Sequence, residues 1–296
     1  MKTVKVFWWR KIDNFGDLLN PYLVEKLGKC KVQYYSIVPK YQALKNIVKS
    51  IILFKKINPD AIDSFRSFGE NLLIIGSVLG RANRKTLVWG AGFMSETETC
   101  VAKKILAVRG KETARKVKEL GFKGIPVLGD PALLLPIIYE RKKNSIYKIG
   151  IIPHWTEYEE FNEKYSGQYK VINLISKDIE GVIDEITSCE YILSSSLHGV
   201  IVGHAYNIPS IWVQEGFIHE DASFKFNDYF SSVNIPYYKG YKIDEVLSSN
   251  DIEGFFVANK EISLINNDLT EIQSQLLHSI PFPLKEKYRH VFSKVS

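Results

Sequence analysis

The residues with the clearest chemical character in this sequence are three consecutive serines followed closely by a histidine. Ser194, Ser195 and Ser196 end a short apolar run, and His198 lies at the start of an apolar stretch with helical spacing. Hydroxyl groups and the free N–H groups of a helix N-terminus can hold an anion together. A histidine in the first turn can act as a general acid, although a lone histidine is more often structural. We predict an anion site at this turn, with His198 facing the same pocket.

A second candidate is Arg109, which follows the apolar run 105–108 and precedes a helical pattern that begins at residue 111. An arginine at the end of a strand suits the bidentate capture of a carboxylate or a phosphate. The alternative is a surface arginine paired with Glu112. The spacing alone favours neither interpretation.

Two further groups lie at the ends of apolar runs. The turn Asn14-Phe15-Gly16-Asp17 comes before the first helical pattern, and Asn14 and Asp17 can either cap that helix or reach into a ligand site. His154-Trp155 combines a proton carrier with an aromatic face on which a sugar can stack. A tryptophan that simply fills the core is the alternative.

These residues need a scaffold that brings the ends of several strands together. Short β-rich apolar runs alternate with longer helical patterns, which is typical of parallel sheets covered by helices. In the first half we expect strands at Val4–Trp9, Leu72–Gly76, Thr86–Trp89, Ile105–Val108 and Pro126–Leu128, and helices at Leu18–Leu27, Tyr41–Phe54 and Lys111–Leu120. In the second half we expect strands at Lys148–Ile152, Val171–Ile175, Tyr191–Ser194 and Ser210–Val213, and helices at Glu157–Lys164, Ile179–Cys189 and Leu197–Tyr206.

The two series indicate an α/β protein with two doubly wound, Rossmann-like domains facing a cleft, in a GT-B-like arrangement. A charged stretch with few apolar residues, from Ile137 to Tyr147, separates them, and linkers have this composition. We place the N-terminal domain at residues 1–143 and the C-terminal domain, with the serine and histidine turn, at residues 144–296. The second domain ends in a helical tail from Lys260 to about His278, which we expect to pack across both domains.

Composition and charge narrow the class of protein. The chain has 296 residues, of which 45% are hydrophobic and 24% charged, and this fits a two-domain globular protein. Residues 1–143 carry 27 Lys and Arg against 12 Asp and Glu, and residues 144–296 carry 12 against 21, so the net charge of +6 combines halves of +15 and −9. This asymmetry indicates an anionic ligand or surface at the N-terminal half. Because no recognition motif for nucleic acid accompanies it, we expect no nucleic-acid partner.

Other features argue against export, membrane spans, disulfides and metal sites. The N-terminus has no apolar region of signal-peptide type, and no stretch approaches the roughly 18 apolar residues of a transmembrane helix. Cys30, Cys100 and Cys189 are odd in number and lack CxxC spacing. We expect Cys189 to be a small buried residue in a helix, no obligatory metal, and a cytoplasmic location.

Eight short segments, in order and spacing over most of the chain, resemble the polysaccharide pyruvyl transferase family. The segments are Asn14–Asp17, Gly76-Ser77, Trp89–Phe93, Val108–Gly110, Gly129–Ala132, Ile151–His154, Ser194–Gly199 and Phe224–Tyr229. The family's arginine after a strand matches Arg109, its histidine in the serine-rich turn matches His198, and its later lysine matches Lys225. Many members have an arginine immediately before the Leu-His pair, where this chain has Ser196.

The resemblance implies transfer of a pyruvyl group from phosphoenolpyruvate to a sugar of a polysaccharide repeat unit or its lipid-linked precursor, forming a ketal, as in exopolysaccharide or capsule biosynthesis. The N-terminal domain would supply the acceptor side and part of the donor site. The expected substrate-binding residues are Arg109, Lys225, Ser194, Ser195, Ser196, Asn14 and His154. We expect His198 to protonate the enol ether or assist phosphate departure, and Asp17 to orient or deprotonate an acceptor hydroxyl. No cofactor is expected beyond the donor substrate.

Two other functions fit parts of the same pattern. A GT-B glycosyltransferase that uses a nucleotide sugar would share the fold and the anion site, but the C-terminal half shows no obvious carboxylate arrangement for a ribose. A non-catalytic carbohydrate-binding protein is the other alternative, and the presence of Arg109, His198 and Lys225 argues against it. The sequence predicts neither the acceptor sugar nor the oligomeric state.

The helical pattern between Tyr41 and Lys56 combines an apolar stripe with lysines. The apolar residues on one face are Leu44, Ile47, Val48, Ile51 and Ile52, and the lysines are Lys45, Lys49, Lys55 and Lys56. A basic amphipathic helix can lie in the interface of an anionic bilayer, here the inner face of the cell membrane. The same stripe can instead pack on the N-terminal sheet, which is the expectation we favour.

Overall fold

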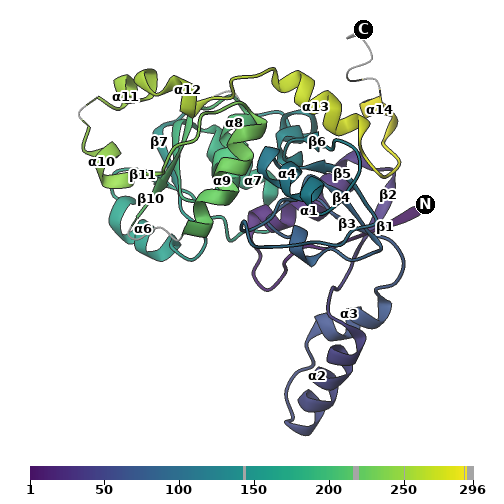
Figure 1. Ribbon diagram of the computed structural model, residues 1–296. Helices are drawn as coiled ribbons and strands as arrows, with labels where there is room; N and C mark the ends of the chain where they lie inside the picture. The colour runs from purple at the N-terminus through teal and green to yellow at the C-terminus, as the bar shows by residue number, and fades with distance from the viewer. Residues whose placement is uncertain (143–144, 216–219, 250, 290, 292–296) are drawn as a thin grey trace.

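Each half of the chain forms one parallel β-sheet with helices around it (Figure 1). The computed structural model describes residues 1–142, 145–215, 220–249, 251–289 and 291. It confirms the predicted α/β class and the pair of parallel sheets. Lys143 and Asn144, where the predicted domain boundary falls, lie outside the described residues.

The first sheet has the strand order β2-β1-β3-β4-β5-β6, with every neighbouring pair parallel. Its strands are β1 (Lys2–Val6), β2 (Cys30–Tyr34), β3 (Asn71–Leu73), β4 (Thr86–Trp89), β5 (Lys104–Val108) and β6 (Val127–Leu128). The helices of this half are α1 (Phe15–Leu27), α2 (Lys40–Ile52), α3 (Pro59–Arg66), α4 (Lys111–Glu119) and α5 (Leu135–Ile138), with the 3-10 turns η1 (Leu79–Arg81) and η2 (Pro131–Leu134).

The second sheet has the order β11-β10-β9-β7-β8 and is also parallel. Its strands are β7 (Tyr147–Ile152), β8 (Lys170–Val171), β9 (Cys189–Ser194), β10 (Ser210–Gln214) and β11 (Tyr241–Lys242). The helices of this half are α6 (Tyr158–Tyr165), α7 (Ile179–Thr187), α8 (Leu197–Ala205), α9 (Glu220–Ser232), α10 (Ile243–Leu247), α11 (Ile252–Ala258), α12 (Lys260–Ser263), α13 (Leu269–His278) and α14 (Glu286–Arg289).

Both sheets contain a point where the strand order changes direction. From β1 the first sheet extends to β2 on one side and to β3 on the other, and from β7 the second extends to β8 and β9. In open parallel sheets, ligands bind beyond the carboxyl ends of the strands at such a switch point. The turn Asn14–Asp17 follows β1, Ser77 lies just beyond β3, His154 follows β7, and the serine turn follows β9. The Asn14–Asp17 turn, His154 and the serine turn therefore lie at the two switch points, whereas Arg109 follows β5 and Lys225 lies on α9.

Helix α1 joins the two halves. It begins at a capped turn, where Asn14 Oδ1 accepts a hydrogen bond from Gly16 N (2.9 Å). Its apolar residues Phe15, Leu19 and Leu23 recur every four positions and are fully buried. Because α1 contacts α7 of the second half, one continuous apolar core includes residues of both sheets and of α1, α7 and α8.

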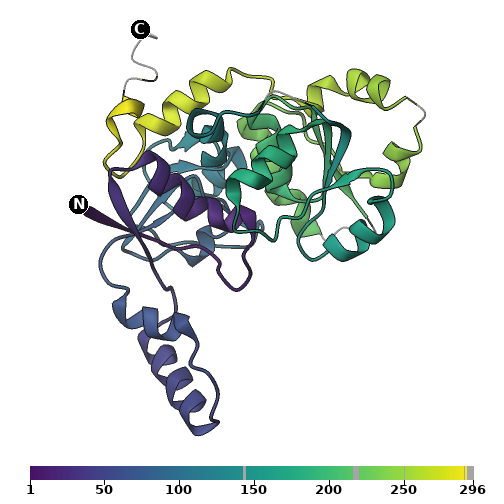
Figure 2. The same ribbon diagram turned by 180° about the vertical axis from the view of Figure 1, so that it is seen from behind.

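Helix α13, near the C-terminus, packs against the first half of the chain. Trp89 Nε1 donates to Leu276 O (3.1 Å), and Gln273 Nε2 donates to Leu133 O (2.7 Å). Figure 2 shows this yellow helix beside the purple N-terminal segments. The predicted tail is two helices rather than one, because the side chain of Asp268 caps a new helix that begins at Leu269.

Helices α2 and α3 project from the body of the protein as an arm, residues 40–66 (Figures 1 and 2). The large apolar side chains of α2 that lie exposed are Leu44, Val48, Ile51 and Ile52. The expectation that this stripe packs on the sheet is therefore wrong: α2 packs against α3 and buries only Ala43. No helix in the described ranges is both long and apolar enough to cross a membrane.

A few elements differ from the prediction for local reasons. Strand β2 was not predicted, although Cys30–Tyr34 alternates between apolar and polar residues as a half-buried strand does. Cys189 is buried, as predicted, but it begins β9 instead of ending α7. Helix α7 ends at Thr187 instead, where Ser188 N donates to Asp184 O (3.0 Å) and closes the last turn.

Candidate active site

The serine turn joins β9 to α8 and leaves the N-terminus of that helix unpaired. Ser194 Oγ donates to Ile152 O (2.8 Å) and accepts from Ser196 N (3.0 Å), which fixes the turn. Among the described residues, the N–H groups of residues 197–199 have no acceptor, and the Ser196 hydroxyl makes no hydrogen bond to the helix. Unpaired donors at the positive end of a nine-residue helix can bind an anion.

Ser195 connects this turn to the loop that follows β7. Its Oγ donates to Glu157 Oε2 (2.5 Å) and accepts from His154 N (2.8 Å). The Nδ1 atom of His154 lies 2.7 Å from Thr156 Oγ1, so Nε2 is the ring nitrogen that remains for a ligand. Burial, and then the charge of Lys225, lowers the pKa of His154 to about 4, and the ring is neutral at neutral pH.

His198 lies where the two halves of the chain meet. Its ring packs so closely on Gly16 that a Cβ atom at position 16 would stand 2.2 Å from His198 Nδ1. Its Nε2 atom is buried and has no hydrogen-bond partner in the described part of the chain. Burial, and then the charges of Arg109 and Lys225, lower the pKa of His198 to about 3. The free protein therefore contains a neutral imidazole with an unpaired Nε2.

A backbone contact holds the two halves together at this point. Phe15 N donates to Leu174 O (2.7 Å), and Asn14 forms an isolated antiparallel bridge with Ile175. These bonds attach the turn after β1 to the loop after β8. They keep Gly16 against the imidazole of the other half.

Asp17 follows Gly16 directly and has an unusual carboxyl group. Burial raises its pKa to about 7, against a backbone hydrogen bond from Trp9 that lowers it. A carboxyl group with a pKa near neutrality can both accept and donate a proton under physiological conditions.

Lys225, on α9, adds a cation to the same region. Burial, and then the like charge of Arg109, lowers its pKa, whereas Glu157 raises it. Within the described ranges its ammonium group makes no hydrogen bond or ion pair, and it lies 5.5 Å from the centre of the Phe226 ring. A largely buried cation without a bonded counter-ion favours an anionic ligand.

Arg109 is fully buried and bonded to protein atoms on all three nitrogens. Its Nε donates to Asp228 Oδ2 (2.9 Å). Its Nη1 donates to Ser77 Oγ (2.6 Å), and its Nη2 donates to Phe93 O (2.7 Å). The interpretation of Arg109 as a surface residue paired with Glu112 is therefore wrong. Together with burial, its positive charge lowers the pKa of His198, while its N–H groups are used in hydrogen bonds within the protein.

Asp228 is the second half of this buried ion pair. Besides Arg109, it accepts hydrogen bonds from Thr113 N (2.8 Å) and Thr113 Oγ1 (2.7 Å) at the start of α4. Because Asp228 and Lys225 belong to the same helix, the pair fixes α9 relative to the first sheet. Lys225 is thereby held near His198.

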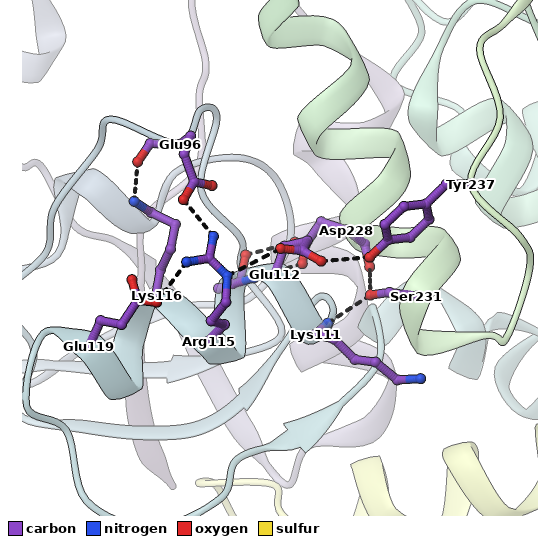
Figure 3. Close-up of polar contacts among 10 residues, drawn as sticks. Glu96, Lys111, Glu112, Arg115, Lys116, Glu119, Asp228, Ser231 and Tyr237 are labelled. Atoms are coloured by element: carbon purple, nitrogen blue, oxygen red, sulfur yellow. Dashed lines mark hydrogen bonds and ion pairs between the residues drawn. The ribbon is translucent and has the colours of Figure 1, made fainter.

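Figure 3 shows more polar contacts around the junction of α4 and α9. Lys111 N donates to Ser231 Oγ (2.8 Å), and Tyr237 OH donates to Glu112 Oε1 (2.6 Å). Arg115, on the outer side of α4, pairs with Glu112 (3.4 Å). The junction therefore combines a buried ion pair with exposed polar contacts.

A comparison with known protein families identifies the family of this chain. A family described as polysaccharide pyruvyl transferase matches residues 14–215. The chain belongs to the polysaccharide pyruvyl transferase family. The matched region begins at the Asn14 turn and includes the loops of Arg109, His154 and His198, whereas Lys225 lies beyond it.

Two relatives in this comparison are similar over large parts of the chain. An uncharacterized protein of Acanthamoeba polyphaga mimivirus is 29% identical over 290 residues, which cover 93% of this chain and 92% of that protein. The succinoglycan biosynthesis protein ExoV of Rhizobium meliloti (strain 1021) is 31% identical over 191 residues, which cover 57% of this chain and 56% of ExoV. The name of the second relative associates it with the synthesis of a polysaccharide.

The predicted site residues of this pyruvyl transferase family member differ in whether their polar atoms are already bonded within the protein. Asp17 follows Gly16, which packs on the His198 ring, and burial together with the charge of Lys225 lowers the pKa of both His154 and His198. The Asn14 side chain is used as a helix cap, and the hydroxyls of Ser194 and Ser195 are bonded within the protein, as are the nitrogens of Arg109. The roles of all these residues in binding or catalysis remain predictions.

Sequence reasoning did not identify two partners of these residues. Glu157 accepts from Ser195 and raises the pKa of Lys225, and its only trace in the sequence is its position shortly after His154. Asp228 lies in a family-like segment, but its pairing with Arg109 spans 119 positions and depends on the tertiary fold. No group of three or more His, Cys, Asp or Glu side chains suited to a metal occurs among the described residues, and metal independence remains a prediction.

Proposed function

We propose that this protein transfers a pyruvyl group from phosphoenolpyruvate to a saccharide and forms a ketal during the biosynthesis of a polysaccharide. The observation that supports this best is the presence, at one junction, of unpaired α8 N–H groups, the Lys225 ammonium and the unpaired Nε2 of His198. Phosphoenolpyruvate has a carboxylate and a phosphate close together, so its site needs donors or cations at both ends and a proton-transfer group between them.

In the proposed complex, the N-terminus of α8 and the Ser196 hydroxyl bind one anionic end of the donor, and Lys225 binds the other. Arg109 adds positive charge to the site without contacting the donor, and it positions α9 through its ion pair with Asp228. Since Ser196 replaces an arginine found in many family members, backbone N–H groups and Lys225 carry more of the donor's charge here.

Donor binding prepares His198 for proton transfer. Its pKa is low in the free protein because burial and two cations oppose the imidazolium form. A multiply charged anion offsets these cations and raises that pKa, so that the imidazole takes up a proton. His198 then protonates the methylene carbon of phosphoenolpyruvate, and the adjacent carbon becomes oxocarbenium-like.

Two acceptor hydroxyls complete the reaction at that carbon. The first adds, the phosphate leaves with the electron pair of its C–O bond, and the second hydroxyl adds in turn. Two hydroxyl protons are released, one of which restores His198 while the other ends on phosphate, so the products are one ketal and one inorganic phosphate. Asp17, with a pKa of about 7, accepts one of these two protons from an acceptor hydroxyl and passes it on to the phosphate.

The acceptor and its location follow from the same proposal. The acceptor lies on the Asp17 side, within an N-terminal domain of residues 1–143, and the donor is held mainly by a domain of residues 144–296 across a GT-B-like cleft. A polysaccharide repeat unit or its lipid-linked precursor, met in the cytoplasm at the inner face of the cell membrane, is the proposed acceptor. The name of the relative ExoV, a succinoglycan biosynthesis protein, supports an acceptor of this class.

The test uses the full-length protein with phosphoenolpyruvate and a panel of defined mono- and oligosaccharides. We expect acceptor-dependent release of inorganic phosphate and a product heavier than its acceptor by pyruvate less one water. His198→Ala should lower the rate by about 100-fold or more, while Lys239→Ala, at an exposed lysine, leaves it unchanged. Release of nucleotide from a sugar nucleotide, with no reaction of phosphoenolpyruvate, would instead assign the protein to the glycosyltransferases.

A further inference from the structure

We propose that the arm, residues 40–66, docks on the anionic surface of a lipid bilayer, with the apolar face of α2 entering the interface and the lysines binding lipid phosphates. The inference goes beyond the proposed reaction, and its test requires neither donor nor acceptor.

The first observation is the amount of apolar side chain that the arm exposes. The exposed apolar residues of the arm are Tyr41, Leu44, Val48, Ile51, Ile52, Leu53, Phe54, Ile62 and Phe65. Leu44, Val48 and Ile51 lie on one face of α2, and Phe54, where the chain leaves that helix, is 99% exposed. Apolar residues gathered on a projecting element mark an interaction surface.

The second observation is the charge beside that face. Five lysines, Lys40, Lys45, Lys49, Lys55 and Lys56, lie between residues 40 and 59, and this segment has no acidic residue. The acidic residues of α3, Asp60 and Asp63, are both paired with Arg10 at 2.7 and 2.5 Å. The positive charge of α2 is therefore not neutralised within the arm. Apolar face and positive charge together are what an anionic bilayer attracts.

The third observation is a polar hollow next to the apolar face. It has a volume of about 210 Å³ and is lined by Asn46, Lys49, Ser50, Leu53, Lys55 and Asn58. Two ammonium groups supply charge there, and amide and hydroxyl groups supply hydrogen-bond donors. This combination suits the phosphate of a lipid headgroup whose acyl chains lie along Ile51 and Ile52.

A bilayer fits these features better than a second copy of the chain does. A symmetric dimer through α2 would place the same surface of both copies together, and the lysines of one copy would face the lysines of the other. The helix has 13 residues, which is too short to span a bilayer that needs about 20. An orientation along the membrane surface satisfies both the apolar face and the lysines.

The base of the arm is connected to the candidate active site. Arg10 binds Asp60 and Asp63 and also stacks on Tyr34, with 3.7 Å from its guanidinium carbon to the ring centre. Arg10 belongs to the loop that leads from β1 into Asn14. A bilayer-bound arm would therefore hold the acceptor side of the site near the membrane surface.

The experiment is co-sedimentation of the full-length protein with vesicles of phosphatidylcholine alone or of phosphatidylcholine with phosphatidylglycerol. We expect binding only to the second kind, and weaker binding at high salt. Lys49→Glu with Lys55→Glu should lower the partition coefficient about fivefold or more for each lysine. Ile51→Ser with Ile52→Ser should lower it about tenfold or more.

Matched controls separate the arm from general surface effects. Lys123→Glu changes the charge by the same amount per residue at an exposed site far along the chain, and Ile125→Ser removes an isoleucine that is 97% exposed. Both should bind like the unchanged protein, and all variants should keep its thermal unfolding temperature. Equal recovery in the supernatant with and without anionic vesicles would overturn the proposal. So would undiminished vesicle binding by the arm variants, or an arm-dependent dimer in sedimentation velocity without lipid.

Discussion

The imidazole of His198 lies directly against the backbone of Gly16, where a Cβ atom would stand 2.2 Å from Nδ1. The two residues come from different halves of the chain and from the switch points of different sheets. The turn after β1 can approach the histidine this closely because residue 16 has no side chain. Asp17 follows Gly16 directly in the same turn.

Replacement of Gly16 by alanine should displace the His198 ring and lower turnover by about tenfold or more, because small misplacements of catalytic groups are costly. The measurement is the steady-state rate of phosphate release with phosphoenolpyruvate and a saccharide acceptor. Gly167→Ala is the matched control, since a Cβ atom there meets no atom within 4 Å. Full activity of Gly16→Ala would show that the contact has no role in the reaction.

The buried pair of Arg109 and Asp228 should be important for stability. Asp228→Ala leaves a buried guanidinium without its counter-ion and should lower the free energy of unfolding by about 3–5 kcal/mol. Urea denaturation measures this loss. Glu119→Ala removes a surface partner of Arg115 and should cost less than about 1 kcal/mol. If Asp228→Ala and Glu119→Ala lowered the free energy of unfolding by the same small amount, the ion pair would not hold the two halves together.

Arg109 also shows what the sequence could and could not predict. Its position at the end of a strand was evident from the apolar run before it, and the parallel sheets followed from the alternation of strands and helices. Its partner was not predictable, since Asp228 is 119 residues away. The exposed stripe of α2 was misread for a related reason: its spacing fits a buried face equally well, and only the position of α3 decides between burial and exposure.

Asp17 should make the stability of the protein depend on pH. The folded-state pKa of about 7 lies above the ordinary value of 3.8, so the folded protein binds more protons than the unfolded chain between these values. Stability therefore falls as the pH rises through this window, and the loss is complete above pH 7. Asp17→Asn should raise the unfolding temperature relative to the unchanged protein more at pH 8 than at pH 4, and it should impair activity.

Glu159→Gln is the control for Asp17→Asn, because Glu159 is exposed on α6. Its effect on the unfolding temperature should be small and independent of pH. An effect of Asp17→Asn that is equal at both pH values would mean that the carboxyl group titrates normally.

The protonation of His198 should respond to the donor. In the free protein its pKa of about 3 keeps the ring neutral at neutral pH, and bound phosphoenolpyruvate should move its titration toward neutral pH by offsetting Arg109 and Lys225. NMR titration of labelled histidines, assigned with His198→Ala, measures both values. If the titration midpoint of His198 is the same with and without donor, the proposed proton uptake on donor binding is wrong.

Equilibrium binding of phosphoenolpyruvate to the full-length protein tests the central claim, a donor site made by Lys225 and the N-terminus of α8, most directly. Isothermal titration should show that the unchanged protein and Lys239→Ala bind the donor equally and that uridine diphosphate does not compete. Lys225→Ala loses a charge-assisted contact worth about 2–5 kcal/mol and should bind about thirtyfold more weakly or worse. Equal affinity in Lys225→Ala, or binding of uridine diphosphate but not of phosphoenolpyruvate, would contradict the account.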